Sequence, residues 1–208
     1  MNHAHRAAPA PAGADHSPDG DVIGRSRSEP ELFALLFQRH ALCIGRYAAR
    51  RLGPGPAEDI VAETFLTAFR QRDRYDAARP DARPWLYGIA GNLIRRHHRD
   101  EGRQLRTLAR IGVDPAAESF TERSDARLVA DASSRAVAAA LAALDPDQRD
   151  VVLLIAWAQL TYDQAAEALG VPEGTVRSRM SRARARLRAR LGDLNPAMIV
   201  DEEDHRHG

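Results

Sequence analysis

The spacing of apolar side chains constrains the fold of this 208-residue chain more than any other feature of its sequence. Over residues 33–48, large apolar residues recur every three or four positions, which is the period of an amphipathic helix. The same period returns over residues 60–69 and 86–93. No stretch alternates polar and apolar residues as a half-buried strand would. The sequence therefore predicts an all-α protein.

Changes in composition divide the chain into two small helical domains. Residues 1–28 hold too few large apolar side chains to offset the entropy of ordering, which predicts a disordered tail. Residues 101–130 have weak periodicity and several Gly, Pro, Ser and Thr residues, which is typical of a flexible linker. The predicted domains are residues 29–100, whose third helix runs from about 84 to 99, and residues 131–191. Residues 192–208 form a C-terminal tail.

Several classes of protein are disfavoured by residues that the sequence lacks. The chain has no Gly-rich phosphate loop, no His-Glu-x-x-His and no nucleophile elbow, so we expect neither an enzyme nor a bound cofactor. His40 and Cys43 share a helix face without further ligands at metal-binding spacing, which favours an ordinary core position over a metal site. The single cysteine, the absence of a signal-peptide pattern and a longest apolar run of eight residues, 151–158, predict a cytoplasmic protein without membrane insertion.

The segment 161–191 has the pattern of a helix-turn-helix. A capping box, Thr161 to Gln164, begins a short helix that ends at Gly170, and a second helix continues to about Leu191. Between Glu173 and Leu191 there are seven arginines and one glutamate, a local charge of +6 in a chain whose net charge is +1. Such a helix suits a phosphate-lined groove. The alternative is a solvated, arginine-rich surface helix.

The helical period predicts which side chains of this second helix would contact DNA. Turning Val176 and Met180 inward points four candidates for base contacts outward, at about 100° per residue. They are Arg177, Ser178, Ser181 and Arg182. Arg179 and Arg184 are further candidates on the same surface.

A polar stripe is predicted on the third helix of the first domain. It consists of Trp85, Gly88, Asn92, Arg96 and Arg99, beside the apolar face. An aromatic ring with an amide and cations suits unstacked bases and their backbone. The competing interpretation is that Trp85 simply belongs to the core, because tryptophan is usually largely buried.

Three motifs resemble the extracytoplasmic-function (ECF) subgroup of bacterial RNA polymerase sigma factors. They are DIVAETFL at 59–66, PWLYGIAGN at 84–92, and GTVRSR at 174–179 with RAR at 182–184. The resemblance spans about residues 30–191. It implies a region 2 helical bundle over 29–100, a region 4 helix-turn-helix over 131–191, and a protein that binds core RNA polymerase, directs it to promoters and promotes DNA melting.

The resemblance also implies which residues meet which partner. The contact with core polymerase, through its largest and second-largest subunits, is expected at Asp59, Glu63, Phe65 and Phe69. The minus-ten promoter element is expected to meet the 72–84 loop and Trp85, Asn92, Arg96 and Arg99. The minus-thirty-five element is expected to meet the arginine and serine side chains of the second helix. An anti-sigma protein is a further candidate partner.

A second hypothesis is a helix-turn-helix regulator whose first domain is a sensor or a dimerisation unit. The segment 160–187 also resembles the output domains of response regulators. The motifs at 59–66 and 84–92 argue against this hypothesis. A regulator would bind duplex promoter DNA alone, whereas a sigma factor would bind it after joining core polymerase.

Overall fold

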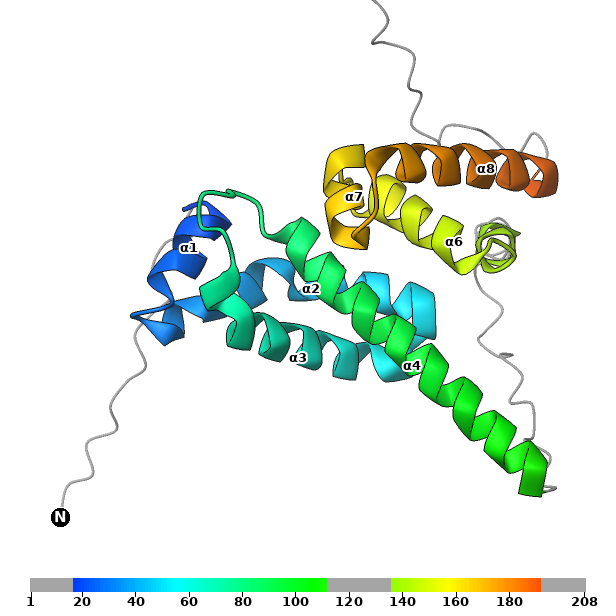
Figure 1. The fold of residues 1–208 in the computed structure, drawn as a ribbon, viewed down its shortest axis with the longest axis horizontal. Helices are drawn as coiled ribbons and strands as arrows, with labels where there is room; N and C mark the ends of the chain where they lie inside the picture. Colours follow the sequence, from blue (N-terminus) through cyan, green and yellow to red (C-terminus); the bar gives the residue numbers. More distant parts are fainter. Residues whose placement is uncertain (1–16, 112–135, 192–208) are drawn as a thin grey trace, which may run out of the picture.

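The structure, a computed structural model, describes residues 17–111 and 136–191. The elements assigned in this part of the chain are all helical, which confirms the all-α prediction. They form two bundles, one N-terminal over 17–111 and one C-terminal over 136–191 (Figure 1). None of the helices in the described ranges is long and apolar enough to cross a membrane.

The N-terminal bundle is built around an antiparallel pair of helices crossed by a third. In chain order its elements are α1 (Asp19–Arg25), η1 (Pro30–Phe33), α2 (Ala34–Leu52), α3 (Pro54–Gln71), η2 (Arg72–Arg74) and α4 (Arg83–Ile111). Gly53, with φ of 82°, allows the tight reversal between α2 and α3 because glycine tolerates positive φ. Leu36, Ile44, Leu86 and Ile94 are fully buried where the helices meet. Helix α4 thus lies across the α2–α3 pair and continues beyond it (Figure 1).

The C-terminal bundle contains the predicted helix-turn-helix. Residues 136–142 are helical, followed by α6 (Pro146–Val152), a single π-helical turn η3 (Leu153–Trp157), α7 (Tyr162–Leu169) and α8 (Glu173–Leu191). The predicted capping box is confirmed: Thr161 Oγ1 accepts from the backbone N–H of Gln164, and Gln164 Oε1 accepts from that of Thr161. Gly170 ends α7 in the left-handed conformation, φ 65°. These local signals set where α7 begins and ends.

The prediction of a disordered tail over 1–28 was wrong for its last twelve positions. Residues 17–28 include α1, whose Val22 and Ile23 are 1 % and 0 % exposed in the core of the N-terminal bundle. Too few apolar residues are present to fold this segment alone, but two of them enter a core formed by residues distant in the sequence. Positions 1–16 of the predicted tail lie outside the described residues.

The third helix is longer than expected and takes up the beginning of the predicted linker. The sequence predicts an end near residue 99, whereas α4 continues to Ile111. Polar residues beyond 99 weaken the amphipathic pattern without interrupting the helix, because no proline intervenes. The rest of the predicted linker, from 112, and the C-terminal tail, 192–208, lie outside the described residues.

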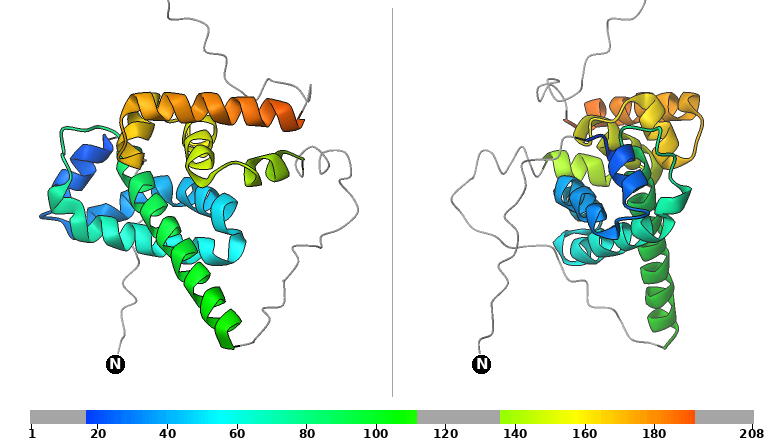
Figure 2. Two further views of the ribbon diagram at one scale, coloured as in Figure 1. Left: turned by 45° about the vertical axis from the view of Figure 1, so that its right-hand side comes forward. Right: turned by 90° about the vertical axis from the view of Figure 1, so that its left-hand side faces the viewer.

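The two bundles are not separate bodies in this structure. Helix α7 packs directly on α4, so the C-terminal bundle lies against the N-terminal one (Figure 2). The predicted flexible linker gave no reason to expect this contact, because such a linker does not specify how two domains pack.

Candidate nucleic-acid interface

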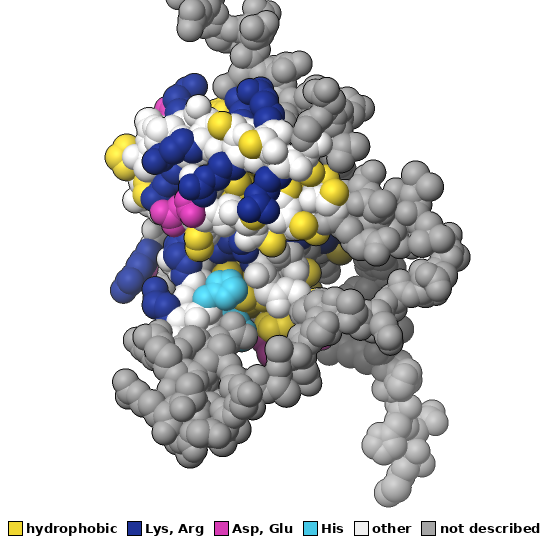
Figure 3. Space-filling view, turned by 90° about the vertical axis from the view of Figure 1, so that its right-hand side faces the viewer, with side chains coloured by type: hydrophobic (Ala, Val, Ile, Leu, Met, Phe, Trp, Pro, Cys, Tyr) yellow, Lys and Arg dark blue, Asp and Glu magenta, His cyan; other side chains and the backbone are white. Residues whose placement is uncertain are grey.

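The outer face of α8 presents the four predicted base-contacting side chains. Val176, Met180 and Ala183 are buried against α6 and α7, as the helical period predicts. This orientation leaves Arg177, Ser178, Ser181 and Arg182 exposed. Helix α8 lies at the far side of the C-terminal bundle from α2 and α3 (Figure 1), and arginine side chains gather on this part of the surface (Figure 3).

Contacts within the helix-turn-helix orient the outward arginines. Arg177 donates to Glu173 Oε1 at 2.6 Å, and its guanidinium lies 4.8 Å from the centre of the Tyr162 ring. Arg182 donates through Nε to the backbone oxygen of Ser178 at 3.2 Å. Both guanidinium groups remain at the surface, where a phosphate or a base edge can reach them.

The other two candidates of this helix, Arg179 and Arg184, are less exposed than the four outward side chains. Arg179 donates to Asp147 Oδ2 at 2.5 Å, and its side chain is only 22 % exposed. Arg184 is half-buried. Arg186 pairs in the same way with Asp145 at 2.8 Å. Arg179 and Arg186 therefore connect α8 to the beginning of α6 through ion pairs at the surface of the bundle, which partly compensate their charges.

The polar stripe of α4 begins at an aromatic pair, the half-buried Trp85 and the buried Tyr75. Trp85 lies against Tyr75, with ring centroids 4.8 Å apart. Tyr75 is buried and its hydroxyl donates to the backbone oxygens of Arg79 and Asp81, so this ring is fixed by the loop that precedes α4. Trp85 keeps part of its ring at the surface, which makes it both a packing residue and a candidate stacking platform.

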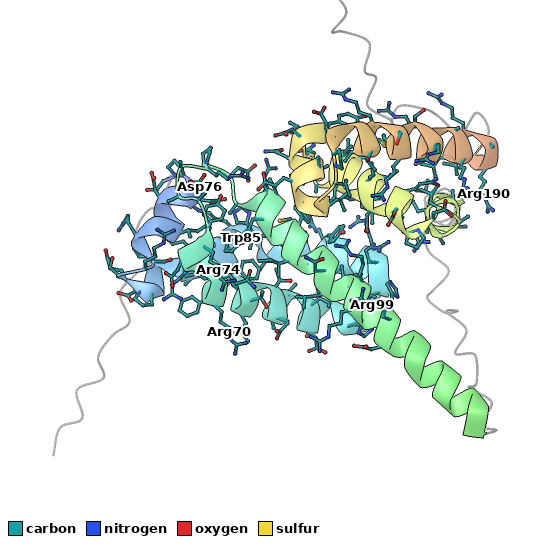
Figure 4. The ribbon with its side chains drawn as sticks, in the orientation of Figure 1. Arg70, Arg74, Asp76, Trp85, Arg99 and Arg190 are labelled. Atoms are coloured by element: carbon teal, nitrogen blue, oxygen red, sulfur yellow. The ribbon has the colours of Figure 1, made fainter. Side chains whose placement is uncertain are left out.

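The remaining stripe residues follow at the surface of α4. Asn92 is exposed, and its side-chain oxygen accepts from Arg95 Nη2 at 2.7 Å. Arg96 is exposed, 3.8 Å from Asp100, and Arg99 is exposed one turn further on. Figure 4 shows Trp85 near the start of α4 and Arg99 well along it. One rigid helix therefore carries the whole stripe.

On α3, the two predicted carboxylates are exposed, but the predicted apolar residue Phe65 is not. Asp59 and Glu63 are exposed as expected. Phe65 is 6 % exposed and packs edge-on against Phe37, so it cannot form the apolar part of a docking face. Leu66, 42 % exposed, supplies that surface instead. Leu66 follows Asp59 and Glu63 at helical spacing, so the sequence alone could have placed all three side chains on one face of the helix.

Phe69 and a neighbouring groove complete this side of the N-terminal bundle. Phe69 is half-buried, edge-on to Phe33 at 5.3 Å, with the Arg72 guanidinium 4.0 Å from its ring centre. A largely apolar groove runs between α2 and α3. It is lined by Phe37, Gly45, Ala57, Glu58, Val61 and Ala62. An apolar groove beside carboxylates suits a partner with apolar and basic side chains.

An ionic cluster, absent from the sequence-based predictions, anchors α1. Asp19 accepts from Arg39 at 2.9 Å and pairs with His40 Nε2 at 2.8 Å. Burial alone would raise the pKa of Asp19, but the hydrogen bond and charge of His40 outweigh it and lower that pKa to about 2. Desolvation likewise opposes the charged form of His40, yet Asp19 and Cys43 raise its pKa to about 9. Both partners are therefore charged near neutral pH.

This cluster also positions the start of α4. Asp19 Oδ2 accepts from the backbone N–H of Ala82 at 3.1 Å, immediately before the helix that carries the stripe. His40 thus has a structural partner in Asp19. Among the described residues, no group of three or more His, Cys, Asp or Glu side chains could hold a metal ion.

Comparisons with known proteins agree with this geometry. The family models "Sigma-70 region 2" and "Sigma-70, region 4" match residues 36–104 and 134–187. Two helical domains with these matches define the class of sigma-70-type transcription factors. The ECF RNA polymerase sigma factor SigL of Mycobacterium tuberculosis is 34 % identical over 175 residues, 83 % of this chain and 96 % of SigL. The sigma factor CarQ of Myxococcus xanthus is 32 % identical over 167 residues, 79 % of this chain and 91 % of CarQ.

Two solved structures are also similar. CnrH, in complex with the cytosolic domain of CnrY, has 28 % identity and a TM-score of 0.59, covering 82 % of this chain and 95 % of CnrH. The sigma factor RpoE of Bartonella quintana, in complex with the anti-sigma factor NepR, has 26 % identity and a TM-score of 0.60, covering 76 % of this chain and 96 % of RpoE. The chain belongs to the ECF RNA polymerase sigma factors, as its motifs predicted. Its N-terminal bundle is region 2 and its C-terminal bundle is region 4.

Proposed function

We propose that this sigma factor uses three separate surfaces to bring core RNA polymerase to its promoters and open the DNA. The observation that carries the proposal is that one chain presents both an aromatic–amide–cation stripe on α4, in which only Trp85 is half-buried, and an outward arginine face on α8. The first chemistry suits unpaired bases and the second suits the edges of paired bases. A regulator that binds only duplex DNA needs the second surface alone.

The face of α8 reads the minus-thirty-five element in this proposal. Arg177 and Arg182 are the candidates for bidentate contacts with bases, and Ser178 and Ser181 lie between them. Arg179 and Arg184 contribute charge near the DNA backbone more than base contacts, because both are half-buried in the bundle.

The stripe on α4 captures the minus-ten element once its strands separate. Trp85 offers a ring for stacking, Asn92 offers an amide for a flipped base, and Arg96 and Arg99 offer charge to the strand backbone. The 72–84 loop lies next to Trp85 through Tyr75 and takes part in the same contact.

Core polymerase docks on the exposed face of α3. Asp59 and Glu63 provide negative charge and Leu66 provides an apolar contact between them and the end of the helix. The mixed face fits basic and apolar side chains on the largest polymerase subunit, with the second-largest subunit contacting the remainder of the holoenzyme interface. The polymerase carries out the chemistry, so the sigma factor itself is not an enzyme and works in the cytoplasm.

Transcription with purified core polymerase tests this function. We expect run-off transcripts from a cognate promoter only when both proteins are present. Asp59→Ala with Glu63→Ala should weaken co-purification with core polymerase while preserving helicity. Tight binding of the free protein to promoter duplex, without association with core polymerase, would contradict the proposal and favour a regulator.

Region-specific variants separate the two DNA contacts. Asn92→Ala should leave promoter binding by the holoenzyme nearly intact and reduce permanganate reactivity in the minus-ten region. A pre-melted bubble template should restore transcription by this variant. A normal bubble with Asn92→Ala would remove this residue from the proposed contact.

An anti-sigma protein is a further proposed partner. The support is that two similar solved structures are complexes: CnrH with the cytosolic domain of CnrY, and RpoE with NepR, which is named as an anti-sigma factor. Affinity purification of the tagged chain from its own cells should recover a protein that blocks run-off transcription when added back. Recovery of polymerase subunits alone would contradict this part of the proposal.

A further inference from the structure

The positive charge of α8 is only partly balanced within region 4. Three of its arginines pair with carboxylates of the same bundle: Arg177, Arg179 and Arg186. Arg182, Arg188 and Arg190 are exposed, and none of them pairs with a carboxylate of residues 17–111 or 136–191. Helix α8 therefore carries charge that the described part of region 4 leaves uncompensated.

This charge extends along the face of α8 that is proposed to read DNA. Arg177, Ser181 and Arg188 are four and seven residues apart, so their side chains form one row at the helical period. Arg182 lies beside this row, whereas Val176 is buried against the rest of the bundle. The row from 177 to 188 is ~17 Å long at ~1.5 Å per residue. An extended anion could therefore contact several of these arginines at once.

The same chain carries the opposite charge a short distance beyond α8. Residues 201–204 are Asp-Glu-Glu-Asp, the longest run of acidic residues in the sequence, and the helix itself ends at Leu191. Four consecutive carboxylates match the sign and the linear arrangement of the arginine row. Charge complementarity thus favours this acidic segment over any other part of the chain as an occupant of the face.

The acidic segment is close enough in the chain to reach the whole row. Ten residues lead from Leu191 to Asp201. Extended backbone spans at most ~3.3–3.6 Å per residue, so these residues can cover ~33–36 Å. Arg177 is the arginine of α8 furthest from Leu191, and it lies ~21 Å away along the helix at ~1.5 Å per residue. The carboxylates can therefore fold back as far as the first arginine of the helix.

Carboxylates suit the same guanidinium groups as DNA phosphates. Arginine donates to either anion through its planar fork of N–H groups. One exposed ion pair contributes little, because water and salt screen it. Several pairs made by a tethered segment gain from the high local concentration that a short tether provides. The acidic segment is thus a competitor for duplex DNA that every copy of the chain carries with it.

We propose that the acidic segment, residues 201–204, folds back onto the outward arginine face of α8 in the free protein and competes there with duplex DNA. The carboxylates replace phosphates but supply no base edges, so the segment weakens binding to every DNA sequence by a similar factor. It therefore suppresses non-specific binding of the free chain. This proposal rests on the proposed function of the α8 face, but docking of the segment can be measured without DNA.

A variant without the acidic charges tests the competition. It combines Asp201→Asn, Glu202→Gln, Glu203→Gln and Asp204→Asn in the full chain and is called the neutral-tail variant. At low salt we expect it to bind a random-sequence duplex at least about fivefold more tightly than the wild type, in a fluorescence anisotropy titration. The gain should shrink as salt is added, because salt screens the pairing between the segment and α8.

Two control variants separate docking from a general effect of charge. Exchanging each Asp for Glu and each Glu for Asp within 201–204 keeps the four charges and should leave DNA binding as in the wild type. Asp21→Asn, Glu29→Gln and Glu31→Gln together remove three exposed carboxylates around α1, which is distant from α8 (Figure 1). This second control should change the affinity less than about twofold. A gain as large as that of the neutral-tail variant would overturn the competition.

A spin label near the acidic segment reports docking directly. The label is attached at Gly208→Cys, and Cys43→Ser removes the natural thiol. It broadens the amide signals of residues that it approaches in the NMR spectrum. We expect broadening along α8 as far as Ser181 in the labelled chain. In the labelled neutral-tail variant, broadening should be confined to the end of the helix near Leu191.

The outcomes distinguish this proposal from the proposed function. Broadening confined to the end of α8 in both labelled proteins would overturn the proposal, whatever their DNA affinities. Broadening along α8 that depends on the acidic charges, together with unchanged DNA affinity in the neutral-tail variant, would show that the segment docks on a face that does not bind DNA. That result would contradict the proposed function of α8 instead.

Discussion

Regions 2 and 4 achieve their folds and their binding surfaces by different means. Region 4 builds its helix-turn-helix from neighbouring residues: a capping box, a left-handed glycine and one inward face of α8. Region 2 joins residues far apart in the sequence, such as Asp19 with His40 and Ala82. Region 4 therefore presents a surface that a single helix defines. The stripe of region 2 depends on α1, on the preceding loop and on the packing of α7 against α4.

We expect the largest loss of stability from a substitution in α1, where region 2 depends on contacts between residues distant in the sequence. A Cβ atom at Gly20 in α1 would lie 2.3 Å from the oxygen of Arg79 and 2.4 Å from that of Ala77. Gly20→Ala should therefore lower the free energy of unfolding by about 3 kcal/mol. Chemical denaturation of the full chain measures this loss.

Gly24→Ala is a matched control in the same helix. Its Cβ would lie 3.5 Å from the Ala77 side chain, an ordinary contact, so this change should be neutral or slightly stabilising. Equal stability of the two variants would mean that α1 contributes nothing to the stability of region 2. It would then contradict the claim that region 2 depends on distant contacts.

A smaller effect should follow from pH, through the cluster that anchors α1. The pKa of His40 is raised to about 9, so its contribution is fully present below pH 6.5 and is lost as pH rises through 9. The pKa of Asp19 is lowered to about 2, so its contribution is present above pH 3.8 and is lost as pH falls through 2. We expect the pair to stabilise region 2 most between pH 4 and 6.5.

Thermal unfolding of wild type and His40→Gln across pH 5 to 10 measures this dependence. The difference in stability between the two proteins should be about 2 kcal/mol at pH 6 and should shrink towards pH 10. A difference that stays constant over the whole range would show that His40 contributes by packing and not by charge.

In region 4, we expect a substitution to weaken DNA recognition by a free energy of similar size without changing the stability of the fold. Arg182→Ala should weaken binding of the holoenzyme to its upstream element by about 1–3 kcal/mol and relax the preference at one base position. Arg188→Ala, an exposed arginine of the same helix outside the predicted set, should lose only its share of the salt-dependent attraction. Binding to a set of single-base promoter variants measures both. Equal relaxation by both changes would contradict a specific role for Arg182.

The smallest expected effect on stability tests whether region 4 depends on local contacts, as the comparison with region 2 implies. Thr161→Ala removes the acceptor for the Gln164 N–H and should lower the stability of region 4 by about 1 kcal/mol. Thr161→Ser keeps the acceptor and should restore most of it. Hydrogen exchange at the start of α7 reports this change, and the same amides should be insensitive to Gly20→Ala. Coupled loss of protection in both regions would mean that the contact between α4 and α7 makes the two domains unfold as one unit.

The sequence by itself determined the features that depend on short-range order. Helical periodicity, the capping box and Gly170 specify the helix-turn-helix, and the same periodicity turns Arg177 and Arg182 outward. These features follow from residues within one or two helical turns, for which the spacing along the chain is also the spacing in space. The motifs of region 2 were likewise sufficient to identify the family.

Only the tertiary structure decided the features that depend on residues distant in the sequence. It placed Phe65 in the core and Leu66 at the surface, because α2 covers one side of α3 and leaves the other open. It ordered α1, which has two core residues and an ionic partner in α2. It also buried Asp150 of α6 against Arg51 of α2, in the contact between the two domains. Periodicity reports which face of a helix is apolar, but the partner that covers each face is set by packing over the whole chain.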